Sequence, residues 1–149
     1  MIAVIFVIIF ATNFVYKKSI VRETMDGFLG ANLPDRCQLF TQIASRSIKD
    51  TIKAASGRVM QIRVTNGQAA VRYFQLFNKA SAPVGANTPV YAVPVNAAAS
   101  SVSHAFFEEE FNPSLNFDTG IAFAMSPNFA TFASSGVDPA DLTVTICYE

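Results

Sequence analysis

The side chains best suited to chemistry are one histidine and one run of three glutamates. His104 is the single histidine of the chain, and Glu108, Glu109 and Glu110 stand together in sequence. Hard cations such as calcium take several carboxylate oxygens, so these glutamates with Asp118 form a candidate calcium site. On a strand, however, Glu108 and Glu110 face one way and Glu109 the other, so all three reach one ion only across a bulge. A solvated or subunit-facing acidic surface is the favoured interpretation, and no metal is expected.

Other signatures of catalysis do not occur in the sequence. A serine hydrolase would need His104 beside a carboxylate and a serine, and no G-x-S-x-G motif is present to position the serine. The glycines are isolated turn residues rather than a phosphate-binding loop. We therefore expect no enzyme and no cofactor.

The two cysteines, Cys37 and Cys147, lie far apart in the chain. Their spacing fits neither a metal motif nor a CxxC redox pair. In the strand expected at the end of the chain, Cys147 has the opposite parity to Leu142, Val144 and Ile146. This pattern favours two free thiols over a disulfide.

The charges are balanced in number but segregated in sequence. Eleven Lys and Arg residues offset eleven Asp and Glu residues, so the formal net charge is zero. That balance gives no electrostatic case for binding nucleic acid. From Thr51 onward every cation precedes Glu108, the first acid, which indicates either solvated faces of different strands or complementary patches between copies. The candidate subunit-contact residues on these segments are Arg58, Arg63, Arg72, Glu108, Glu109 and Glu110.

The first sixteen residues, Met1 to Tyr16, contain no charged side chain and are followed by Lys17 and Lys18. As a helix they would extend about 24 Å, short of a hydrocarbon core of about 30 Å. Three interpretations stay open: a membrane segment with the lysines on the cytoplasmic side, a buried or intersubunit arm, or an unusual leader. For the arm, the candidate contact residues are Ile5, Phe6, Ile9 and Phe10.

Residues 19–47 have the composition of a linker after the hydrophobic segment 1–18. Glycines and Pro34 interrupt the first part. Asp35 could cap a short helix through about Asp50, with an apolar stripe of Leu39, Ile43 and Phe40 on one side.

The clearest pattern in the chain runs from Thr51 to Pro83. Met60, Ile62 and Val64 alternate with polar residues, which is typical of a strand. Asn66-Gly67 is a strong hairpin signal, and a second apolar strand follows up to Lys79. The sequence therefore predicts a hairpin at the centre of the fold.

The remaining segments predict an all-β domain over residues 48–149. About seven to eight strands recur at intervals of roughly ten residues, the pattern of an antiparallel β-sandwich or jelly roll. Pro89 and Pro94 place the strand 88–95 at a sheet edge or a bulge. Small residues between Ile121 and Met125 predict a strand buried on both faces, and the last strand should turn Leu142, Val144, Ile146 and Tyr148 inward.

Several of these segments resemble, in the same order, a group of small tailed-phage virion structural proteins. The matching motifs are IKAASGRV, NGQAAVRYFQLFNKA, TPV, GIAFA and DLTVTICY, and they cover about Ile52 to Tyr148. The resemblance implies a β-sandwich component of a phage particle, either a capsid decoration (cement) protein or a tail-associated protein. Residues 1–50 lie outside it, and the acidic FFEEEF run replaces an expected less charged strand.

Two hypotheses follow from the sequence. The first is a non-enzymatic virion protein that assembles as a homo-oligomer and contacts the major capsid protein or a tail protein, with no specific nucleic acid bound. The alternative is a membrane-anchored β-sandwich module that recognises a carbohydrate or surface partner, with membrane contact through residues 1–16.

Overall fold

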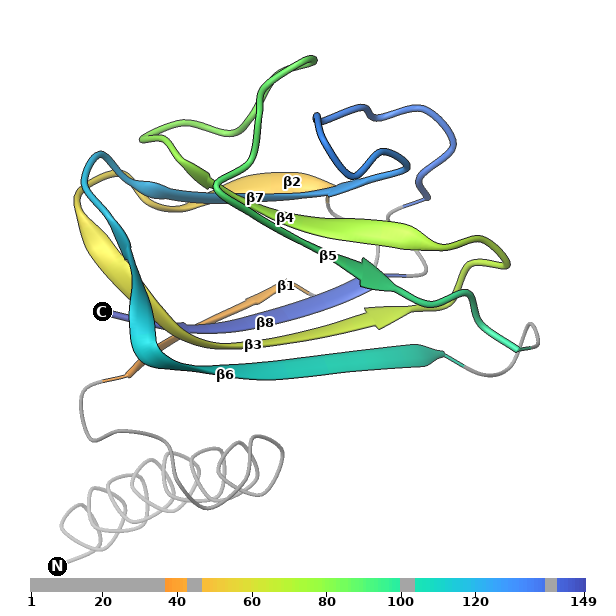
Figure 1. Ribbon diagram of the computed structural model, residues 1–149, viewed down its shortest axis with the longest axis horizontal. Coiled ribbons are helices and arrows are strands. Elements are labelled where there is room, and N and C mark those ends of the chain that lie inside the picture. Colours follow the sequence, from red (N-terminus) through yellow and green to blue (C-terminus); the bar gives the residue numbers. More distant parts are fainter. Residues whose placement is uncertain (1–36, 43–46, 100–103, 139–141) are drawn as a thin grey trace, which may run out of the picture. The chain divides into compact units, whose positions relative to one another are not determined.

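The computed structural model describes residues 37–42, 47–99, 104–138 and 142–149. This part of the chain forms eight β-strands and no helix (Figure 1). The strands are β1 (Gln38–Gln42), β2 (Lys49–Lys53), β3 (Gly57–Asn66), β4 (Arg72–Asn78), β5 (Tyr91–Val95), β6 (Ala105–Phe117), β7 (Ile121–Ser126) and β8 (Leu142–Tyr148).

The strands form two four-stranded antiparallel sheets that lie one above the other (Figure 1). Sheet A has the order β1-β8-β3-β6 and sheet B the order β2-β7-β4-β5. The pairing is nested, since β1 pairs with β8, β2 with β7, β3 with β6 and β4 with β5. Two further pairings, β3 with β8 and β4 with β7, join these pairs within each sheet. The expectation of an all-β antiparallel sandwich is confirmed.

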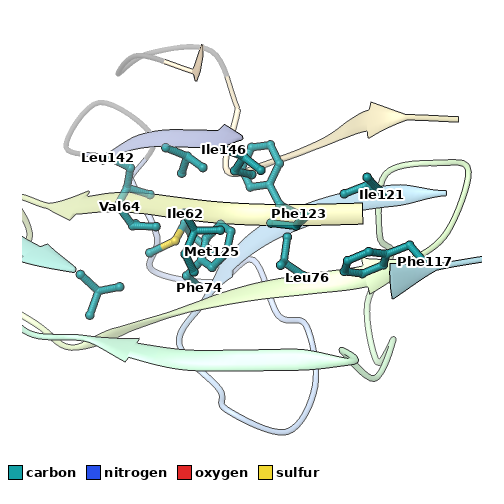
Figure 2. Close-up of a cluster of buried hydrophobic side chains, with 13 residues drawn as sticks. Ile62, Val64, Phe74, Leu76, Phe117, Ile121, Phe123, Met125, Leu142 and Ile146 are labelled. Atoms are coloured by element: carbon teal, nitrogen blue, oxygen red, sulfur yellow. The ribbon is translucent and has the colours of Figure 1, made fainter. Parts of the chain in front are cut away.

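The core lies between the sheets and is filled by alternate side chains of both (Figure 2). The phenylalanines dominate it: the Phe123 ring lies 5.5 Å from that of Phe40 and 6.2 Å from that of Phe74, centroid to centroid. Leu142, Val144 and Ile146 are buried in the core, and Tyr148 packs against it, as predicted for β8.

Strand β7 is buried on both of its faces, as its small alternate residues predicted. All six of its residues are buried. Ile121, Phe123 and Met125 face the main core, whereas Ala122 and Ala124 belong to a second apolar cluster with Phe77 and Phe132. Small side chains on the outward face leave room for Phe132 to pack there.

The predicted hairpin at the centre of the fold is wrong. Strands β3 and β4 belong to different sheets, so residues 67–71 cross from one sheet to the other. A two-residue hairpin turn of the expected type needs positive φ at both central residues, yet Gly136 is the only glycine, and Ala86 the only other residue, with positive φ among those described. Asn66 is instead fully buried at the corner.

The side chain of Asn66 replaces the turn hydrogen bonds. Its Nδ2 donates to the carbonyl oxygens of Ala70 at 2.9 Å, Asn96 at 2.9 Å and Val95 at 3.3 Å, and its Oδ1 accepts from the amide of Gln68 at 3.0 Å. A buried polar group is stable only with such partners. Asn66 therefore ties the β3–β4 crossover to the end of β5.

The helix expected through Asp50 is also wrong for the residues described. Gln38–Gln42 forms β1, paired with β8, and Lys49–Lys53 forms β2, so the sandwich begins ahead of residue 48. The apolar residues near the start of the expected helix belong to a strand instead, since Phe40 of β1 points into the core and contacts Phe123.

The expectation of free thiols is wrong as well: Cys37 and Cys147 form a disulfide, with their Cα atoms 5.5 Å apart. The pairing of β1 with β8 brings them together, since Leu39 is the partner of Cys147 in the ladder and Cys37 lies two residues before it. The parity that separates Cys147 from the core residues of β8 places it on the side where Cys37 lies.

The prolines have the predicted effect on β5. This strand pairs with β4 alone and forms the edge of sheet B, and Pro94 is exposed there. Proline cannot donate a ladder hydrogen bond, so an edge is where it is tolerated.

Candidate functional site

The acidic run Glu108 to Glu110 lies along β6. Among the described residues, no group of three or more His, Cys, Asp and Glu side chains could hold a metal ion. Glu108, Glu109 and Glu110 alternate along β6 as a strand requires, with the first and third exposed and the second half-buried. His104, one residue before β6, is exposed.

Arg58 is engaged within the chain. Its guanidinium forms an ion pair with the carboxylate of Glu149, with Nε donating to Oε2 at 2.9 Å. The two residues also exchange a pair of backbone hydrogen bonds of 2.9 Å. Arg58 therefore holds the chain beyond β8 against the start of β3.

Arg63 lies on the outer face of sheet A, where β3 and β6 are neighbours. Its guanidinium carbon lies 4.6 Å from the centroid of the Phe106 ring, a cation–π arrangement. Next to this pair, Nε2 of Gln61 donates to Oε1 of Glu108 at 2.8 Å. Arg63, Phe106, Gln61 and Glu108 of this face thus have partners within the chain.

Arg72 fastens a loop. Its guanidinium donates to Oε1 of Gln68 and to the carbonyl oxygen of Gly136. Gln68 in turn donates from Nε2 to the carbonyl oxygen of Asp138 at 2.8 Å. The third arginine therefore connects the β3–β4 crossover to the β7–β8 loop.

Glu109 connects the two sheets at one side of the sandwich. It accepts a hydrogen bond from the hydroxyl of Tyr91, so the edge strand β6 of sheet A is joined to the edge strand β5 of sheet B. The Tyr91 ring also packs edge-on against Phe111, with 5.2 Å between centroids. Burial, together with the hydrogen bond to Glu109 and its charge, raises the pKa of Tyr91. The tyrosine hydroxyl therefore stays protonated, and donates its hydrogen bond to the carboxylate, well into the alkaline range.

Two loops cover the β7 side of the outer face of sheet B. Phe132 packs on Phe77, Ala122 and Ala124. Its backbone exchanges hydrogen bonds with the other loop, since its amide donates to Asn87 at 2.9 Å and its carbonyl accepts from Ala86 at 3.1 Å.

Polar side chains fasten this cover to the strands. Nε2 of Gln75, a fully buried residue of β4, lies within hydrogen-bond distance of the carbonyl oxygens of Asn128 (2.8 Å), Phe129 (3.1 Å) and Thr131 (3.4 Å). Lys49 donates to the carbonyl oxygen of Pro83 at 2.7 Å and lies 5.1 Å from the centroid of the Phe132 ring.

The β5 side of the same face is apolar and exposed. Tyr91, Val93 and Val95 point inward, so the alternate residues of that segment point outward. Tyr73 is the ladder partner of Pro94, and its ring packs edge-on against Phe129 at 5.6 Å. We call this surface the apolar patch; it consists of Tyr73, Val90, Ala92, Pro94 and Phe129.

The apolar patch was not predicted from the sequence. Its signal was present in residues 88–95, because the outward positions 90, 92 and 94 carry no polar side chain. The arm residues Ile5, Phe6, Ile9 and Phe10 lie outside the described residues. Within the described residues, no helix is long and apolar enough to cross a membrane.

Comparison of the sequence with protein-family models and with curated proteins finds no match. The fold, the surfaces and the resemblance of the motifs are the features that bear on function.

Proposed function

We propose that the chain is a non-enzymatic structural component of a phage virion, with a capsid decoration role favoured. The observation that carries the proposal is the order of the strands. In sheets β1-β8-β3-β6 and β2-β7-β4-β5, each strand pairs with its nested partner from the other half of the chain. This is the order of a jelly roll, an architecture typical of viral capsid proteins and also of lectins and cupins.

The filled interior supports a building block over a container for a ligand. The side chains between the sheets are large and fully buried, among them Phe74, Phe117, Phe123 and Met125. Glu109, the acidic side chain on the inward side of β6, is engaged by Tyr91. Chemistry inside a jelly roll needs a cavity with converging polar groups, and the described core consists of packed apolar side chains.

The edges of the sheets favour contacts through faces rather than through added strands. Sheet edges invite pairing with other chains unless they are protected. Strand β5 carries Pro94, and β6 turns Glu109 inward and leaves register with β3 between Glu110 and Leu115. At the other side of the sandwich, β1 and β2 have five residues each, and β2 carries Lys49, Asp50 and Lys53. Many modest face contacts repeated around a symmetric shell would then hold the protein in place.

The location of the protein tests the proposal. Particles from a lysate that contains the protein would be purified on a density gradient and digested for quantitative mass spectrometry. We expect the chain to band with the particles at a fixed ratio to the major capsid protein, and a decoration role predicts a copy number close to that of the capsid protein. A ratio of a few copies per particle would indicate the tail, and absence from intact particles would refute the virion role.

A further inference from the structure

Among the described residues, the exposed large hydrophobic side chains are grouped only on sheet B. Five such side chains are exposed, and two of them, Val90 at 61% and Phe129 at 55%, belong to the apolar patch on sheet B. Val71, at 41%, and Val84, at 57%, lie in loops as single residues. Phe106 on sheet A is 50% exposed, but the Arg63 guanidinium lies over its ring. A grouped, uncharged apolar surface is typical of a binding site, whereas single exposed hydrophobic residues are ordinary.

The chemistry of the apolar patch restricts its occupant. A partner must be apolar and uncharged, and it must lie on a sheet face, because Pro94 weakens strand addition at the β5 edge. The chain itself carries such a segment: Met1 to Tyr16 has no charged side chain and is dominated by Ile, Val and Phe. That segment precedes Cys37, the first described residue, by twenty further residues, 17–36.

The position of Cys37 favours a segment from another copy. Cys37 is bonded to Cys147 and leads into β1, at one edge of sheet A. Phe40 of β1 contacts Phe123 of β7, so that edge lies under the β2–β7 side of sheet B. The apolar patch lies at the β5 edge, the opposite side and the opposite sheet. A segment that leaves at Cys37 therefore starts on the side of the sandwich away from its own patch, which favours the patch of a neighbouring copy as its site.

We propose that the apolar patch binds the Met1–Tyr16 segment of a neighbouring copy, so that each subunit is linked to the next by its own arm. This inference rests on the proposed function as a lattice component and names the contact that would hold the lattice together.

Photo-crosslinking of the full chain tests the contact directly. A benzophenone amino acid would replace Phe129 in the patch in one sample and Phe106 on sheet A in the matched control. The unlabelled probe-bearing chain would be mixed and concentrated with heavy-isotope chain that lacks the probe, irradiated and digested with trypsin. Lys17 is the first basic residue, so the arm is released as the peptide 1–17.

We expect light–heavy products that join the probe at position 129 to peptide 1–17, and at least about tenfold fewer from position 106. Light–light products alone would overturn the proposal in favour of a segment folded on its own subunit. Capture of lipid or of another segment at position 129, equal capture at both positions, or no product would also overturn it.

Substitution gives an independent measurement on the same two aromatic residues. Phe129→Ser with Val90→Ser should weaken self-association of the full chain by about tenfold or more, as expected for the loss of apolar anchors at an interface. Phe106→Ser should leave it unchanged. Equal effects would overturn the proposal. Because these measurements use the isolated protein and the virion proposal uses purified particles, a failure of one proposal is distinguishable from a failure of the other.

Discussion

The outer faces of the two sheets use their side chains in opposite ways. On sheet A, at β3 and β6, polar and aromatic side chains are paired with each other, as Arg63 is with Phe106 and Gln61 is with Glu108. On sheet B, loops bury one half of the face under Phe132 and leave the other half apolar. Charge on a surface is therefore a poor guide to contact here, because Arg58, Arg63 and Glu108 already have partners in their own chain. The exposed apolar residues of sheet B are the stronger candidates.

The largest expected difference between the two faces concerns a phenylalanine on each. Phe132→Ala should lower the free energy of unfolding by about 3–5 kcal/mol, because it removes a buried ring from the cluster on β4 and β7. Phe106→Ala, the matched change on sheet A, should cost about 1 kcal/mol or less, since its ring is half exposed. Urea unfolding of both variants measures the difference. Equal losses would mean that the loops do not seal sheet B.

The disulfide between Cys37 and Cys147 attaches the edge strand β1 to β8 of sheet A and should contribute to the free energy of unfolding. The double variant Cys37→Ser, Cys147→Ala should lose about 2–4 kcal/mol relative to the oxidised protein, because the bond closes a long loop in the unfolded chain. Unfolding with and without reductant checks this. Reductant should lower the unfolding midpoint of the natural chain and leave that of the double variant unchanged. If reductant does not change the midpoint of the natural chain, the disulfide contributes nothing to stability.

One glutamine on each sheet, Gln75 on sheet B and Gln61 on sheet A, allows the stability contribution of polar side chains on the two faces to be compared. Gln75→Met should cost about 1–3 kcal/mol, because three carbonyl oxygens in the 128–131 segment lose their buried donor. Gln61→Met on sheet A removes one exposed hydrogen bond to Glu108 and should cost within about 0.5 kcal/mol. Hydrogen exchange should also show faster opening of the 128–131 amides in the Gln75 variant alone. Unchanged exchange there would contradict the fastening role.

Most strands and the inward residues of β7 and β8 could be predicted from the sequence, because the alternation of side chains along a strand depends only on neighbouring residues. The sequence also predicted the edge position of β5 from Pro94, because a missing amide donor is also a local property. It failed at Asn66 and at Phe40, where the partner is distant in the chain. The Asn-Gly dipeptide is compatible with a hairpin turn and with a crossover between sheets. The contacts of Asn66 with the carbonyl groups of Val95 and Asn96 belong to the crossover, and they lie about thirty residues away in the chain. The intrachain partners of the arginines were likewise invisible, since pairing across strands depends on sheet order.

The hydrogen bond between Tyr91 and Glu109 joins the edges of the two sheets, and its contribution should depend on pH. A raised pKa in the folded state means that folding favours the protonated tyrosine. The resulting stability is fully present below the ordinary value near 10 and is lost as the pH rises above it. Urea unfolding between pH 8 and pH 11 should therefore show a steeper alkaline loss for the natural chain than for Tyr91→Phe. Parallel curves for the two proteins would contradict this role.

The smallest expected effect decides whether the pairing on sheet A is energetic or only geometric. A double-mutant cycle of Arg63→Ala and Phe106→Ala should give a coupling of about 0.5–1 kcal/mol, the range for an exposed cation–π contact. The coupling should persist at high salt better than that of Arg58 with Glu149, an exposed ion pair that salt screens. A coupling indistinguishable from zero would leave Phe106 an unpartnered exposed ring. Sheet A would then present an apolar surface of its own, and the contrast between the faces would rest on the loops of sheet B alone.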